Sequence, residues 1–356
     1  MSSRTSPART GIAEPMASAS ATAKPVIIFR LGSLGDTVVA LPCFHAIARA
    51  FPDQPRLALT NVPVSSKAAA LEIILSAGGF IQGAIDYPVG LRDPAGLWRL
   101  RARLRATGAD TLVYLSPVRP AKAVRRDRLF FRLCGFTRII GLPLTEDLRV
   151  NRIDRATQEV EPEAERLARN MAALGPIDLD DRANWDLRLT AAERAAGAAA
   201  IAPLGGRRFF AVNLGGKAAE KDWGDANWSA LVQRLAAEIG DRGLVAVGAG
   251  EDFERSAAVL ACWPGPTANL CGALSPRETA AALAQADFFV GHDSGPLHLA
   301  AAGNTPTAGL FGGYNRPRQW HPYGPGHEPV HEMDGMAAIG VERVHAAARK
   351  LIAERP

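Results

Sequence analysis

The sequence predicts an α/β protein made of two domains, each with a parallel sheet, that face each other across a cleft. Short apolar runs typical of buried strands alternate with segments of helical periodicity, and this series occurs twice along the chain. Glycine-containing loops follow several of the strands. Ligands of such folds bind at the carboxyl ends of the strands, so these loops are where we expect the functional residues.

The length of 356 residues favours two domains, each large enough to bury its own core. We expect a disordered tail at 1–24, a first domain at 25–180 and a second domain at 181–356. The tail has too few large apolar side chains to offset the entropy lost on ordering. The linker is expected near 176–186, before a new series of strands and helices begins.

The expected elements follow from the apolar pattern. In the first half we expect strands at 26–29, 57–60, 84–87, 111–115 and 138–140, with helices at 37–51, 65–76, 94–107, 121–134 and 162–174. In the second half we expect strands at 209–214, 244–247, 268–270, 288–290 and 307–311, with helices at 226–239, 252–260, 276–286, 296–302 and 341–353.

Composition excludes some classes of protein. The formal net charge of +5 is compatible with an anionic ligand but does not demand nucleic acid, and no recognised nucleic-acid-binding module is present. No apolar run approaches the roughly 20 residues that a transmembrane helix needs. The four cysteines form no metal-binding spacing, so we interpret them as reduced, mostly buried thiols of a cytoplasmic protein.

The first loop of interest, 32–36, lies between the first strand and its helix. Its glycines permit a tight backbone, and Asp36 at the helix start is either a cap or a catalytic carboxylate. The loop lacks the third glycine of the dinucleotide fingerprint, and the second strand ends in Thr60-Asn61 rather than in an acid. A dehydrogenase is therefore disfavoured.

Two loops of the second half also carry candidate residues. The loop 213–223 has two glycines and the lysines Lys217 and Lys221, which are either solvated or placed to neutralise a diphosphate. The loop 291–298 reads Gly-His-Asp-Ser-Gly-Pro-Leu-His and opens a helix, whose free N–H groups suit an anion. Within it, His298 is either a ligand contact or a packed core histidine.

These motifs resemble the bacterial lipopolysaccharide heptosyltransferase family, glycosyltransferase family 9. The run 29–36 followed by Leu41-Pro42 is similar to the opening motif of the family, and Lys221-Asp222-Trp223 is similar to its Lys-x-Trp element. The stretch from Ala286 to Gly312 is similar to its best-known signature. The resemblance covers nearly everything from residue 25 to about residue 350.

The resemblance implies a GT-B fold, with two Rossmann-like domains that bind acceptor and donor respectively. It implies inverting transfer of a sugar, typically from ADP-heptose, without a required metal or other cofactor. In this reading Asp36 is the general base and Lys221 stabilises the departing diphosphate. The expected donor-binding residues are Gly35, Lys217, Glu251, Asp293, Ser294, Gly295, Pro296 and His298. Asp252 and Glu254 compete with Glu251 for the ribose.

A basic segment, Arg119 to Arg138, is the candidate for binding the acceptor, through Arg119, Lys122, Arg125 and Arg126. It could instead lie against an anionic inner membrane, as a peripheral contact, or be a solvated face. Two other functions stay open: a GT-B enzyme that uses another nucleotide sugar for O-antigen, capsule or another glycan, and a non-catalytic nucleotide-binding protein. The presence of both Asp36 and Lys221 disfavours the latter.

Overall fold

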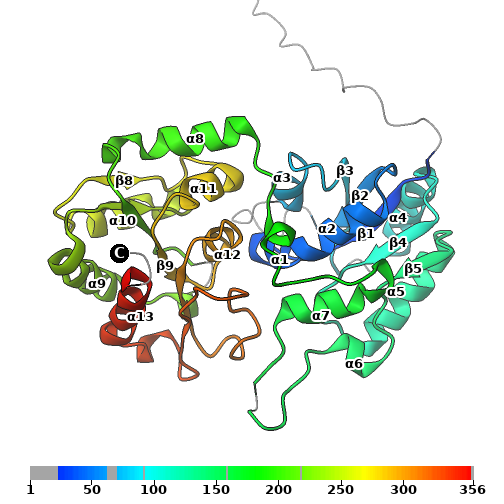
Figure 1. The fold of residues 1–356 in the computed structure, drawn as a ribbon. Helices are drawn as coiled ribbons and strands as arrows, with labels where there is room; N and C mark the ends of the chain where they lie inside the picture. Colours follow the sequence, from blue (N-terminus) through cyan, green and yellow to red (C-terminus); the bar gives the residue numbers. More distant parts are fainter. Residues whose placement is uncertain (1–22, 62–69, 91–92, 158, 217–218, 354–356) are drawn as a thin grey trace, which may run out of the picture.

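The computed structural model describes residues 23–61, 70–90, 93–157, 159–216 and 219–353. Two parallel sheets lie side by side, each with helices on both faces (Figure 1). The tail expected over 1–24 lies almost wholly outside the described residues, as do Lys217 and much of the helix expected over 65–76.

The first sheet has the strand order β3-β2-β1-β4-β5, and all its pairs are parallel. Its central strand β1 (Val26–Phe29) is fully buried, as its uninterrupted apolar sequence predicts. The other strands are β2 (Arg56–Thr60), β3 (Gly83–Asp86), β4 (Thr111–Tyr114) and β5 (Arg138–Ile140). The helices are α1 (Leu34–Val39), α2 (Leu41–Ala50), α3 (Leu71–Leu75), α4 (Pro94–Ala106), α5 (Ala121–Leu133), α6 (Glu146–Arg149) and α7 (Glu163–Asn170).

The helix expected over 37–51 is wrong in its bounds and its continuity. The chain forms two helices, which meet at Ala40, and Pro42 lies in the first turn of α2, where its missing N–H costs no hydrogen bond. Helix α1 begins at Leu34, because the side chain of Asp36 reaches back to the backbone N–H of Ser33. The acid that we considered as a cap does stabilise this helix start.

The second sheet has the order β11-β10-β9-β6-β7-β8, again with parallel pairs. Its strands are β6 (Phe209–Asn213), β7 (Gly243–Ala246), β8 (Thr267–Asn269), β9 (Phe289–His292), β10 (Thr307–Phe311) and β11 (Val330–His331). Its helices are α8 (Ala191–Ile201), α9 (Asp225–Ile239), α10 (Phe253–Leu260), α11 (Pro276–Leu283), α12 (Gly295–Ala302) and α13 (Val341–Ala353). The short elements α6 and β11 were not predicted, because neither is long enough to show periodicity.

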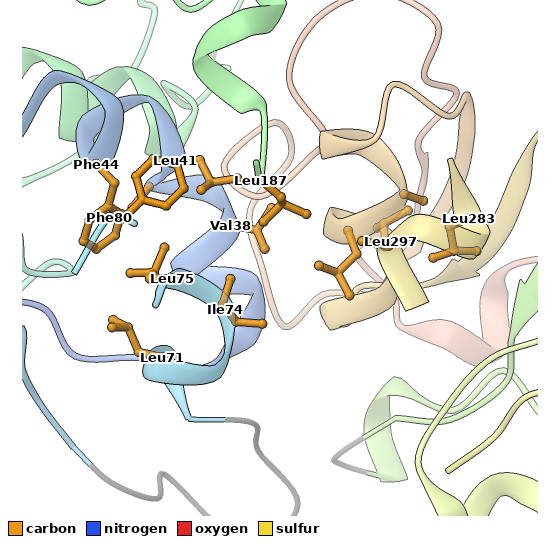
Figure 2. Packing of buried hydrophobic residues seen from close by; sticks show 14 of the residues in the cluster. Val38, Leu41, Phe44, Leu71, Ile74, Leu75, Phe80, Leu187, Leu283 and Leu297 are labelled. Carbon is orange, nitrogen blue, oxygen red and sulfur yellow. The ribbon is translucent and has the colours of Figure 1, made fainter. Parts of the chain in front are cut away.

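One apolar cluster joins the two halves. Figure 2 shows Val38 and Ile74 of the first half approaching Leu297 of α12, with Leu187 from the connecting segment beside them. Buried Arg277 of α11 adds polar contacts across the same boundary, since its Nη1 donates to the backbone oxygens of Ile74 and Leu187, 2.7 and 2.9 Å away. These contacts place α1 against α12.

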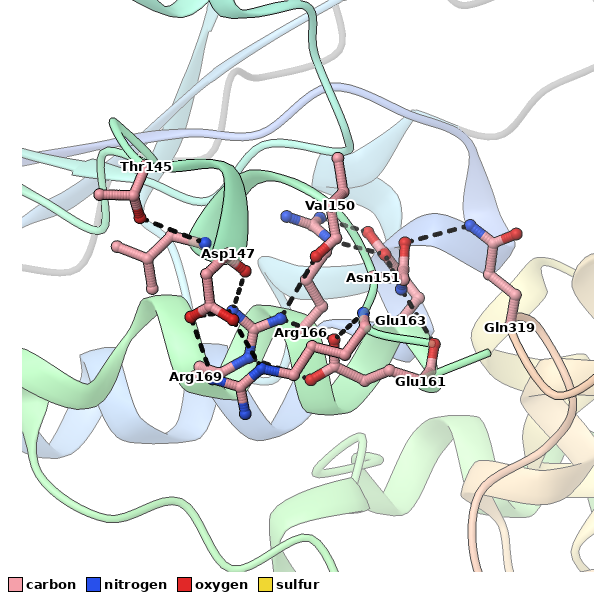
Figure 3. Close-up of polar contacts among 11 residues, drawn as sticks. Thr145, Asp147, Val150, Asn151, Glu161, Glu163, Arg166, Arg169 and Gln319 are labelled. Carbon is pink, nitrogen blue, oxygen red and sulfur yellow. Dashed lines mark hydrogen bonds and ion pairs between the residues drawn. The ribbon is translucent and has the colours of Figure 1, made fainter. Parts of the chain in front are cut away.

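A buried polar network makes a second connection between the halves (Figure 3). Arg166 and Glu163 of α7 form an ion pair with almost no exposed surface. The backbone N–H of Glu163 donates to the carbonyl of Gln319, and the Gln319 amide donates to Asn151 Oδ1, 3.2 Å away. Because Gln319 belongs to the loop after β10, this network holds that loop against the first half.

Two expectations about the whole chain can be checked on the described residues. The four cysteines are free thiols, and three of them are buried, as predicted. Among the helices of the described segments, none is long and apolar enough to cross a bilayer.

Candidate active site

The facing helices α1 and α12 form one wall of a cavity of about 390 Å³ at the carboxyl ends of β1 and β9. The two helices approach closely at glycines: a Cβ on Gly35 would lie 2.8 Å from the His298 ring, and one on Gly295 would lie 2.7 Å from Leu34. The cavity is lined by Ser33, Gly35, Asp36, Lys221, Asp293, Ser294, Gly295, His298, Tyr314, Asn315 and Trp320. Three loops that the sequence singled out therefore meet in one place.

The carboxylate of Asp36 is oriented by its own loop. Its Oδ2 accepts hydrogen bonds from the backbone N–H and the hydroxyl of Ser33, at 2.7 and 2.9 Å. Gly32, at φ 139°, lets the chain pass so close that a Cβ there would collide with the Asp36 side chain. The fully buried guanidinium of Arg30 donates to the Asp36 carbonyl oxygen. No described residue donates to Oδ1, so this oxygen can accept a proton from a ligand.

Asp293, just before α12, is the centre of a cluster of charged and polar side chains in this cavity. Lys221 Nζ lies 2.8 Å from its Oδ2, Asn315 donates to the same oxygen, and His298 Nε2 lies 3.7 Å from Oδ1. Burial by itself would raise the pKa of Asp293, but the nearby His298 ring and the charge of Lys221 prevail and lower it to about 2. The carboxylate is thus ionised at neutral pH and fixes the position of Lys221.

A second cavity, of about 260 Å³, adjoins the first and is lined mostly by residues of the second half, and both cavities are lined by Ser294 and Gly295. No side chain caps the N-terminus of α12 there, because the Ser294 hydroxyl donates instead to Asn213 Oδ1, 2.8 Å away. Helix N–H groups and the helix dipole favour an anion at this point. The cavity is lined by Leu34, Asn213, Gly215, Gly216, Gly248, Ala249, Glu251, Asp252, Gly272, Leu274, Pro276, Thr279, Ser294, Gly295, Pro296 and Leu299.

His292 lies behind the site rather than in it. Its Nε2 accepts a hydrogen bond from the backbone N–H of Trp223 at 3.1 Å, so its Nδ1 carries the proton and faces the Gly215 carbonyl. The ring also packs edge-on against Trp228, at 5.3 Å between centroids. This neutral histidine therefore holds the loop that carries Lys221 against β9.

The buried histidines predict an acid-sensitive fold. Burial lowers the pKa values of His292, His321 and His327 to about 4, against about 6.5 in the unfolded chain. Between these values the unfolded chain binds more protons, so the free energy of unfolding should fall as the pH falls from 6.5 to 4. Thermal unfolding across this range measures the slope. His292→Gln, whose amide oxygen can still accept from Trp223, should give a shallower slope, and a flat profile in the parent would contradict the burial.

The contact of Gly35 with His298 predicts a sensitive position. Gly35→Ala places a methyl group against the His298 ring, so α1 and α12 must separate, and we expect a loss of activity of about tenfold or more, since small misplacements can cost up to 10²-fold. Gly340→Ala is the matched control, because a Cβ there meets nothing within 4 Å. Turnover rates measured beside thermal unfolding separate misalignment from unfolding. Equal rates for the two variants would contradict the close fit.

The predicted acceptor residues separate into two groups. Arg119 and Arg126 line a third cavity, of about 200 Å³, at the carboxyl end of β3, and both pair with buried Asp127 at 3.2 and 3.3 Å. Lys122 and Arg125 are exposed on α5 and do not line this cavity. The basic segment therefore presents two different surfaces.

The site also contains residues that sequence reasoning missed. Tyr314, Asn315 and Trp320 come from the loop after β10, and the Tyr314 ring lies 4.8 Å from Lys221 Nζ. The general rule that ligands bind after the carboxyl ends of parallel strands could have pointed to this loop, which follows Gly312-Gly313. Within the described segments, no group of three or more histidine, cysteine, aspartate or glutamate side chains is arranged to hold a metal ion.

Two parallel-sheet units face a shared cavity in which the uncapped N-terminus of α12 lies near Lys221, an arrangement that suits an anionic ligand. The model of glycosyltransferase family 9 (heptosyltransferase) matches residues 135–340, which is more than half of the chain. The chain belongs to this family and is a glycosyltransferase.

The relatives agree with this assignment. Lipopolysaccharide heptosyltransferase 3 of Escherichia coli is 33% identical over 112 residues, which are 30% of this chain and 32% of that protein. The match spans about a third of the length of that curated relative.

Solved structures show the same fold at low identity. A family 9 glycosyl transferase from Veillonella parvula matches with a TM-score of 0.70 and 18% identity, over 95% of this chain and 100% of that one. E. coli ADP-heptose LPS heptosyltransferase II matches with a TM-score of 0.64 and 17% identity, over 93% of this chain and 99% of that one. E. coli heptosyltransferase WaaC with ADP-2-deoxy-2-fluoro heptose matches with a TM-score of 0.60 and 17% identity, over 93% of this chain and 100% of that one. The predicted GT-B fold is confirmed.

Proposed function

We propose that the protein transfers a heptose from ADP-heptose to a hydroxyl of a saccharide of the lipopolysaccharide core, with inversion at the anomeric carbon. Two relatives support this choice, since one is named a lipopolysaccharide heptosyltransferase and another was solved with an ADP-heptose analogue. The observation that carries the proposal is the joining of two cavities at the N-terminus of α12.

The donor spans the two cavities in this proposal. The diphosphate lies at the shared wall, against the N–H groups of Ser294 and Gly295. The nucleoside occupies the smaller cavity, whose lining includes Glu251 and Pro296, and the sugar occupies the larger one, near Asp293 and His298. Glycines in the loops that line the smaller cavity carry no side chain, which leaves room for the planar base of the nucleotide.

The transfer then follows from the positions of two side chains. Asp36 removes the proton of the acceptor hydroxyl, whose oxygen forms a bond to the anomeric carbon. The bond from that carbon to the diphosphate breaks, and Lys221 together with the α12 N-terminus stabilises the charge on the leaving ADP. We propose that this cationic environment acts without a metal ion, so excess chelator should leave the rate unchanged.

The acceptor occupies the first half in this proposal. Arg119 and Arg126 share one carboxylate, Asp127, so the pair retains one net positive charge in a cavity otherwise walled by apolar groups such as Phe130 and Val89. Such a cavity fits a sugar that bears an anionic substituent. The exposed Lys122 and Arg125 then serve at most the outer parts of the acceptor.

The test is thermal unfolding of the purified protein with ADP-heptose and with ADP-, GDP- and UDP-linked hexoses, followed by transfer assays. A donor at about a hundred times its Kd adds roughly 2.7 kcal/mol of stability, which shifts the melting temperature measurably. We expect ADP-heptose to give the largest shift. A larger shift with another nucleotide sugar would replace the heptose assignment, and no shift with any donor would overturn the proposal.

A further inference from the structure

Helices α4 and α5 form one outer surface of the first half (Figure 1). Leu100 and Leu104 of α4 and Phe131 of α5 are buried in the same apolar cluster beneath β1 and β4. Arg101 Nε donates to the carbonyl oxygen of Leu133, 2.9 Å away, and so links the two helices. We call their solvent side, defined by Trp98, Arg105, Arg128, Leu129 and Leu133, the α4–α5 face.

The α4–α5 face combines positive charge with exposed apolar groups. Trp98, Leu129 and Leu133 are 64%, 63% and 58% exposed, and the Arg101 guanidinium lies 4.7 Å from the centre of the Trp98 ring. Within α4 and α5 the acid present is Asp127, which is buried and paired. The bases of the two helices are Arg99, Arg101, Arg103, Arg105, Lys122, Arg125, Arg126, Arg128 and Arg132.

A cavity of about 260 Å³ opens beside this face. Arg128 and Arg132 line it together with Leu144 and Leu148. Asn170, which is only 8% exposed, also lines it, and its Oδ1 accepts no hydrogen bond from any described residue. Two cations beside an unpaired buried acceptor suit a phosphate that carries a neighbouring hydroxyl.

The chemistry of the face favours a bilayer over a soluble polyanion. A nucleic acid or an acidic protein segment would satisfy the arginines but would offer little to Leu129 and Leu133. An anionic bilayer offers phosphates to the cations and an apolar boundary to exposed leucine and tryptophan side chains. A lipid surface is therefore the partner that would bind both the arginines and the exposed apolar side chains of this face.

We propose that the α4–α5 face docks on an anionic lipid bilayer, and that the cavity beside it seats the phosphate and a hydroxyl of a polyol headgroup such as phosphatidylglycerol. Docking would hold the active-site cavity near acceptors that are anchored in the same membrane. Vesicle binding needs neither donor nor acceptor, so this proposal and the proposed sugar transfer can fail separately.

The test is flotation of the full chain with vesicles of phosphatidylcholine, alone or mixed with phosphatidylglycerol or phosphatidylserine. We expect binding to the anionic vesicles that weakens at high salt, with a preference for phosphatidylglycerol. The variant Arg105→Glu/Arg128→Glu should bind about thirtyfold more weakly, from about 1 kcal/mol for each lost cation. Trp98→Gln/Leu129→Gln should also weaken binding, and Asn170→Ala should remove the preference for phosphatidylglycerol.

The matched control is Arg194→Glu/Arg207→Glu, which makes the same charge change at exposed positions of the second half. It should bind like the parent, and unchanged melting temperatures should show that all variants are folded. No binding to anionic vesicles, or an equal loss in the control, would overturn the proposal. A loss in the arginine variant but none in Trp98→Gln/Leu129→Gln would also overturn it and indicate a soluble polyanion.

Discussion

Asp36→Asn is expected to lower kcat by about 10³-fold while donor affinity changes little, since general base catalysis contributes 10²–10⁴-fold. The amide cannot take a proton from the acceptor hydroxyl, but its oxygen can still accept the hydrogen bonds from the backbone and hydroxyl of Ser33. The loop and helix α1 should therefore keep their structure. Single-turnover rates and donor titration measure the two quantities separately.

The control for Asp36 is Ser33→Ala, which removes one of the two donors to the carboxylate and leaves the carboxylate itself. We expect a loss of activity far smaller than that of Asp36→Asn. If Asp36→Asn kept a near-normal rate, Asp36 would be a helix cap alone. If both variants lost activity equally, the carboxylate would act through the loop structure rather than as a base.

Lys221→Met is expected to lower kcat by about 10²–10³-fold and also to weaken donor binding, because the ammonium would face the diphosphate before and during departure. The structure adds a second effect. Without Lys221, the Asp293 carboxylate loses the ion pair at 2.8 Å, and its pKa should rise from about 2. Transfer kinetics and donor titration measure the catalytic loss.

The double variant Lys221→Met/Asp293→Asn separates the two effects. It removes both charges, so stability lost in the single variant should return while turnover stays low. Lys350→Met is the matched control, because Lys350 of helix α13 makes an exposed ion pair with Glu328, does not line either cavity of the site, and should leave turnover intact. Full activity in Lys221→Met would show that another cation neutralises the diphosphate.

The sequence alone was sufficient for the parallel α/β class and the family motifs. Strands such as β1 and β6 are buried on both faces, so their apolar runs are continuous and easily recognised. The loops around Asp36, Lys221 and Asp293 could be found because glycines and charged side chains follow those strands directly. The periodic pattern of each strand and helix is local, so it can be recognised without knowing which other elements that strand or helix packs against.

The break between α1 and α2 and the contributions of Tyr314, Asn315 and Trp320 depended on tertiary structure. Those three side chains reach the cavity because the loop after β10 is held against the first half through Gln319. The sequence records no distance between residues 151 and 319, so this contact could not be predicted from it.

The sequence by itself determined the fold class, the family and the residue types available at each loop, since these depend on side-chain chemistry and short-range spacing. The tertiary structure decided which of those residues meet. It placed Asp36 in one cavity with Lys221 and Asp293. It also separated the basic segment into a pair that lines a cavity, Arg119 and Arg126, and an outer face on α4 and α5. The reason is that the packing of α1 against α12, and of α4 beside α5, joins residues far apart in the chain.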